Sequence, residues 1–170
     1  MDHGPRKRLR RAHRLLEIGE HASAATIFEQ LARRAHDRGL LHHAPNLYLQ
    51  AARANILAGA PQQAKELIDL GLGILAEKQR WPALQRMGGR VVLELEQLGS
   101  PDLATEIDNW LTSTLPTDIH SQSQERPMAQ RGILPLKCPF CGGVLRPDEV
   151  EMLDTETGEC SYCGSAVRKK

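Results

Sequence analysis

CPFCGG, at residues 138–143, and CSYCG, at residues 160–164, are the two stretches that decide how the end of this chain folds. They contain all four cysteines of the chain: Cys138, Cys141, Cys160 and Cys163. Two Cys-x-x-Cys pairs favour metal binding, and zinc accepts four thiolates in a tetrahedron at about 2.3 Å. The sequence therefore predicts one Zn²⁺ held by these four residues.

The residues around the cysteines predict a small β zinc ribbon over 136–170. A glycine follows each pair, Gly142 and Gly164, where the chain must turn tightly around the ion. Residues 144–145 and 150–153 have the composition of short strands, and 154–158 that of a hairpin turn. A domain of about 35 residues buries too little apolar surface to fold alone, so the metal is expected to supply much of its folding free energy.

The predicted metal site is structural. Four cysteine ligands leave no open coordination position for water or substrate, which argues against catalysis at the metal. The doubled Cys-x-x-Cys-Gly pattern also resembles rubredoxin, and this resemblance implies an alternative metal, iron, and an alternative function, electron transfer. The short spacer between the pairs and the low aromatic content, 4%, favour zinc.

The first two thirds of the chain repeat with a fixed period. Gly19, Gly59 and Gly99 lie forty residues apart, and each is followed five residues later by an alanine. Apolar residues on both sides of these glycines have helical spacing, and a glycine suits the left-handed turn that closes a helix. Residues 1–115 are therefore predicted to be an all-α array of three helical hairpins.

This pattern resembles the tetratricopeptide repeat, which places glycine, alanine and large apolar residues at these offsets. The first two copies fit at the following positions: Gly19, Ala24, Phe28, Leu31, Gly59, Ala64, Ile68 and Gly71. The third copy departs from it, with Asp108 at an apolar position and with Gly88 and Gly89, which predict a break or bend in a helix. The resemblance implies a concave surface that binds segments of partner proteins, and hence a non-enzymatic adaptor.

The two predicted domains are joined by residues 116–135, which are polar and rich in proline. Such a composition predicts a flexible linker, so we expect the two domains to be mobile relative to each other. The pairing of helical repeats with a rubredoxin-like metal domain resembles the architecture of a bacterial lipopolysaccharide-assembly family.

Charge gives a third hypothesis, a nucleic-acid-associated regulator. The net charge of +1 produces no overall attraction to nucleic acid, but the start of the first helix carries six cations: Arg6, Lys7, Arg8, Arg10, Arg11 and Arg14. Phe140 and Tyr162, each just before the second cysteine of its pair, could stack on bases, although shielding of the metal is the expected role. His36, His42 and His43 lack the spacing of a second metal site.

Other functions are not expected from the sequence. The chain begins with a charged segment, contains no run of eighteen apolar residues and keeps its cysteines in metal-binding pairs, which predicts a cytoplasmic protein without a membrane span. Phosphate-binding glycine loops, nucleophile elbows and acid-base pairs are not found, so an enzyme is not predicted.

Overall fold

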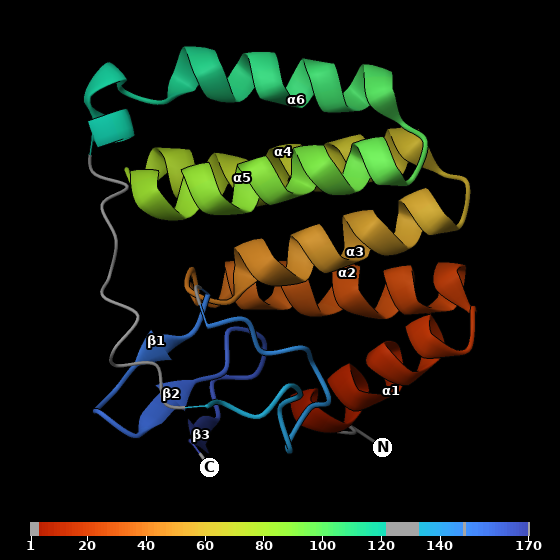
Figure 1. The fold of residues 1–170 in the computed structure, drawn as a ribbon. Helices are drawn as coiled ribbons and strands as arrows, with labels where there is room; N and C mark the ends of the chain where they lie inside the picture. The colour runs from red at the N-terminus through yellow and green to blue at the C-terminus, as the bar shows by residue number, and fades with distance from the viewer. Residues whose placement is uncertain (1–3, 122–132, 148, 170) are drawn as a thin grey trace.

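The computed structural model describes residues 4–121, 133–147 and 149–169, which form an array of helices followed by a small β sheet (Figure 1). The helices of the described chain are α1 Pro5–Glu17, α2 His21–Asp37, α3 Ala44–Leu57, α4 Pro61–Glu77, α5 Trp81–Gln97 and α6 Pro101–Thr114. Each helix packs against its neighbours in sequence, so the array grows in chain order. Small alanines and larger apolar side chains such as Phe28, Tyr48 and Leu72 fill its core.

The glycine turns lie where the period predicts them. Gly19, Gly59 and Gly99 have φ values of 84°, 78° and 79°, and the amide after each glycine donates to the carbonyl five residues earlier. These left-handed residues end α1, α3 and α5 and let the chain reverse into the next helix. The predicted helix-turn-helix units are therefore confirmed at their turns.

A turn of the same kind joins α4 to α5 without a glycine. Gln79 has φ 53°, and the Arg80 amide donates to the Leu75 carbonyl at 2.9 Å. A side chain makes the left-handed conformation costly, by roughly 1–2 kcal/mol. The forty-residue period gave no signal for this turn because it falls between the repeated glycines.

Helix α5 runs without interruption through Gly88 and Gly89, so a break at these glycines, one of the two predicted alternatives, does not occur. The two glycines differ in their surroundings. A Cβ atom at Gly88 would lie 2.5 Å from Leu111 Cδ2 on α6, whereas one at Gly89 would meet nothing within 4 Å. Gly88 is small because α5 and α6 approach closely, and not because the helix ends there.

The described residues after α6 include a short helix. Thr117–Ser121, inside the predicted linker, forms a 3-10 helix, and Ile119 is buried. Leu134 is buried as well. Residues 122–132, the remainder of the predicted flexible linker, lie outside the described residues.

The C-terminal sheet has three antiparallel strands in the order β1 Glu151–Met152, β2 Thr157–Glu159 and β3 Ala166–Arg168. Asp154 Oδ1 accepts hydrogen bonds from the amides of Glu156 and Thr157, which closes the predicted hairpin turn. The expected strand at 144–145 is reduced to a single bridge between Lys137 and Val144. Strand β3 was not predicted, because three residues are too few to show alternation.

Candidate metal centre

The four cysteines form one compact cluster. Their sulfurs all lie within 4.8 Å of one another, and the Cys138–Cys163 and Cys141–Cys160 sulfur pairs are each 3.8 Å apart. A disulfide requires about 2.05 Å between sulfurs, so the cysteines are free thiols. Ligands about 2.3 Å from a tetrahedral ion stand about 3.8 Å from each other. The cluster therefore has the dimensions of a four-thiolate metal site.

Each Cys-x-x-Cys pair is held by the same backbone hydrogen bonds. The Cys138 amide donates to the Gly143 carbonyl, and the Gly142 amide returns a bond to the Cys138 carbonyl, at 2.8 and 2.9 Å. The second pair repeats this with Cys160, Ser165 and Gly164, each bond 2.9 Å long. Gly142 and Gly164 have φ values of 80° and 68°, the left-handed conformation expected of the glycines in these turns.

The thiols of the cluster perturb one another's proton affinity. Hydrogen bonds from Cys160 and Cys163, together with burial, raise the pKa of the Cys141 thiol. Hydrogen bonds from Cys141 and Cys160 lower the pKa of Cys163, which also lies 3.1 Å from Ser165 Oγ. Negative charge is thus favoured at Cys163 and protons at Cys141. A cation that binds all four as thiolates must displace those protons, so metal binding is expected to release them.

The ribbon, meaning described residues 133–147 and 149–169, packs directly against the helices (Figure 1). Tyr162 is buried, and its hydroxyl accepts a 3.0 Å hydrogen bond from Gln50 Nε2 on α3. The His13 ring of α1 lies between Phe28 and Tyr162, edge to face with both, at centroid distances of 5.0 and 5.4 Å. The two domains, which were expected to be mobile relative to each other, thus share packing around Tyr162 in this structure.

Polar contacts extend this junction on both sides of Tyr162. Arg10 donates to the Phe140 carbonyl at 2.8 Å, and His43 Nδ1 lies 3.1 Å from the Ser161 carbonyl oxygen. Ion pairs flank these contacts, with Glu17 of α1 joined to Lys137 and Arg90 of α5 joined to Glu149.

All these helical residues belong to α1, α3 and α5, or directly precede α3. They are spaced by three or four residues along each helix, as Arg10, His13 and Glu17 show on α1. We call the surface that they share the odd-helix face, and we define it by the following residues: Arg10, His13, Glu17, His43, Asn46, Gln50, Arg90 and Glu94. Sequence analysis missed this face. Its only signal is polar residues at helical spacing, which solvated faces also show.

We call each Cys-x-x-Cys pair with its following glycine a knuckle, and each knuckle contains one aromatic residue. These two aromatic residues have different surroundings. Tyr162 is 4% exposed, whereas Phe140 is 40% exposed. The guanidinium of Arg6 lies over the Phe140 ring, 5.4 Å from its centroid. The burial of Tyr162 therefore fits the expected role of shielding the metal site. Phe140 fits this role less well, because it is partly exposed to solvent.

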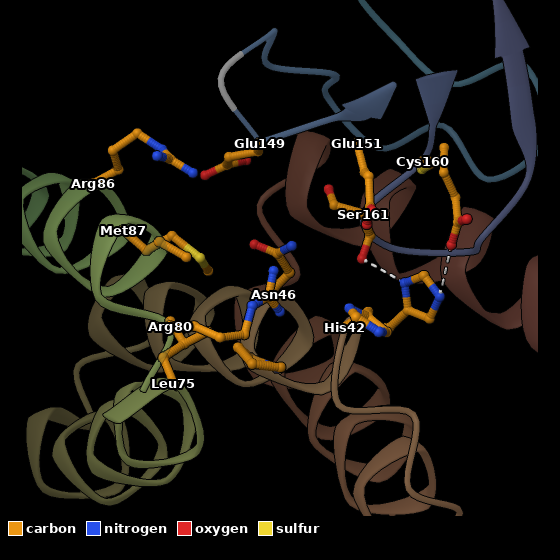
Figure 2. Close-up of a pocket in the computed structure, with 14 residues that line it drawn as sticks. His42, Asn46, Leu75, Arg80, Arg86, Met87, Glu149, Glu151, Cys160 and Ser161 are labelled. Carbon is orange, nitrogen blue, oxygen red and sulfur yellow. Dashed lines mark hydrogen bonds and ion pairs between the residues drawn. The ribbon is translucent and has the colours of Figure 1, made fainter. Parts of the chain in front are cut away.

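A cavity of about 60 Å³ lies between the ribbon and helices α3 to α5 (Figure 2). Arg80 and Arg86 line its helical side, and Glu149, Glu151 and Glu159 its ribbon side. The walls are thus oppositely charged. Glu149 pairs with Arg90 and Arg146, and Glu159 lies 3.3 Å from His43 Nε2, so part of this charge already joins the two domains.

His36, His42 and His43, for which no second metal site was predicted, do not share a site. His43 contacts the ribbon, His42 lines the cavity and His36 contacts the Tyr48 hydroxyl at 3.3 Å. Within the described ranges, the four cysteines are the single group of His, Cys, Asp and Glu side chains close enough to hold a metal ion.

Comparison of the chain with protein-family models, with curated proteins and with solved structures finds no match. Function must therefore be argued from the site itself. None of the helices in the described part of the chain combines the length and apolar character that a membrane crossing requires.

Proposed function

We propose that the protein is a non-enzymatic adaptor. Its helix pairs act as tetratricopeptide-like repeats that bind partner proteins, and its C-terminal zinc ribbon is a structural module that contributes to recognition. The odd-helix face carries the argument, because it is built from polar side chains that contact another protein segment.

The chemistry of the odd-helix face supports a role in binding protein segments. Arg10 and His43 reach main-chain carbonyl oxygens of Phe140 and Ser161, groups that any polypeptide presents. Gln50 and Arg90 add side-chain contacts to Tyr162 and Glu149. A face with these properties suits an extended partner as well as it suits the ribbon.

Within the described residues, the ribbon's hydrogen bond to α3 is made at Gln50, in the first half of the helix, and part of the neighbouring surface is exposed. Arg53 and Leu57 continue the face of Asn46 and Gln50 towards the end of α3, and Leu57 is 37% exposed. Leu93 on α5 is 59% exposed. We place the partner segment on this open end of α3 and α5, beside the ribbon.

Zinc is the metal proposed for the four cysteines. The donors are all thiolates, the site is closed, and three of the four cysteines are buried, which suits a structural zinc ion without redox chemistry. The rubredoxin-like alternative predicts iron in the same site and a coloured protein. Metal analysis of protein produced with both metals in the medium distinguishes the two.

Affinity capture with surface variants tests the adaptor proposal. Leu57→Asp and Leu93→Asp each place a charge on the proposed partner site, and we expect the quantity of specifically captured proteins to fall at least tenfold. Leu40→Asp is the matched control, since Leu40 is 48% exposed but lies in the turn between α2 and α3. Capture that is equal for all three variants and the parent chain would contradict the proposal.

A further inference from the structure

Helix α1 carries an unusual concentration of positive charge. Between Pro5 and Leu16 the chain has six Lys or Arg residues and no Asp or Glu. The helix dipole is positive at the N-terminus of a helix, so the cations Arg6, Lys7 and Arg8 at the start of α1 lower its stability.

None of these six cations is ion-paired with a carboxylate in the described structure. Arg8 bonds to the neutral Gln30, Arg10 to a carbonyl oxygen, and Arg6 covers the Phe140 ring. Lys65 and Arg146, in contrast, each pair with two carboxylates. The cations of α1 thus have no carboxylate within ion-pair distance among the described residues.

Docking of the ribbon brings an aromatic ring into this basic surface. Phe140 lies between Arg6 and Arg10, which contact its ring and its carbonyl, and 40% of the residue stays exposed. Lys7, Arg11 and Arg14 follow at helical spacing on the adjoining exposed face of α1. Phe140 and Arg6 are separated by more than a hundred residues in sequence, so only the fold creates this combination.

We propose that the α1 surface, defined as Arg6, Lys7, Arg10, Arg11, Arg14 and Phe140, binds single-stranded nucleic acid. The cations contact backbone phosphates, and an unstacked base packs on the exposed ring of Phe140. Proteins that bind single strands without sequence preference combine a basic track with aromatic stacking in this way. This activity goes beyond the adaptor function, and Arg10 is the one residue that the α1 surface shares with the odd-helix face.

Salt-dependent binding of fluorescent oligonucleotides tests the phosphate contacts. The probes are single strands of about 16 nucleotides, one of RNA and one of DNA. Each phosphate contact contributes about 0.7 to the slope of log affinity against log salt, so Lys7→Gln with Arg11→Gln should lower the slope by about 1.4. The matched control is Arg38→Gln with Lys78→Gln, two exposed cations that directly follow α2 and α4, which should leave the slope unchanged.

Phe140→Leu tests stacking separately from charge. Loss of the ring should weaken binding about tenfold or more without changing the salt slope, because no phosphate contact is removed. Circular dichroism and metal content should match the parent chain, which shows that each variant is folded. Similar affinities of the protein for the RNA and DNA oligonucleotides indicate recognition of phosphate and base alone. A higher affinity for RNA indicates additional contacts to the 2′-hydroxyl.

Three outcomes overturn the proposal. The first is absence of oligonucleotide binding by the folded parent chain at low salt, and the second is an equal loss of slope in the control variant. The third is binding to vesicles that contain anionic lipid with no binding to single strands, which would assign the α1 surface to a membrane instead.

Discussion

His13 is the residue at which the helices and the ribbon are most closely joined. It is largely buried between Phe28 and Tyr162, and its Nε2 atom has no hydrogen-bond partner within the described structure. Burial lowers the pKa of His13 from 6.5 to about 4, while nearby Glu17 opposes the shift and Lys137 adds to it. The folded protein therefore holds this histidine neutral at neutral pH.

This depressed pKa predicts a loss of stability in mild acid. A proton binds the unfolded chain near pH 6.5 but the folded chain only near pH 4, so stability is full above pH 6.5 and falls as pH decreases between these values. From pH 7.5 to 5.5 the His13 contribution to the free energy of unfolding should fall by about 1 kcal/mol.

Urea unfolding of the parent chain and of His13→Leu at both pH values measures this contribution. The parent should lose about 1 kcal/mol more than the variant over the interval, whatever their stabilities at pH 7.5. The comparison removes other groups that titrate in this range, including the cysteine cluster. Equal losses in the two proteins would show that His13 is not held neutral by burial.

At the scale of elements, the helix pairs and the cysteine cluster were predictable because their signals are local. The glycines at positions 19, 59 and 99, and the cysteines separated by two residues within each pair, are recognised from their spacing along the chain. Gln79 could not be predicted, because its positive φ is imposed by neighbouring helices and not by its own preference. The contacts of His13 and Gln50 depend on a domain more than a hundred residues away.

Gly88 and Gly89 on α5 give a matched test of how the last two helices pack. A methyl group at Gly88 would force Leu111 on α6 to move, so Gly88→Ala should lower the free energy of unfolding by about 1–2 kcal/mol. Gly89→Ala adds the same methyl group in open space and should raise it by about 0.5–1 kcal/mol. Thermal unfolding of both variants checks the difference, and stabilisation by both would refute the close approach of α5 and α6.

At the scale of the whole molecule, the metal centre and the odd-helix face depend on each other. Tyr162 lies between Cys160 and Cys163 in sequence and packs on His13 and Gln50. The two Cys-x-x-Cys pairs contain the turns that carry Phe140 and Tyr162, so the ribbon's contacts with α1 and α3 require these turns to be folded. Loss of the metal should free the odd-helix face while leaving the helices folded.

Native mass spectrometry of the full chain tests the central claim, that the four cysteines hold one structural zinc ion. The account predicts a mass increase equal to one zinc in the parent chain, with the cysteine protons displaced, and loss of that metal in Cys141→Ser. A chain that carries iron would support the redox alternative instead. A metal-free chain whose mass shows two disulfides would contradict the account.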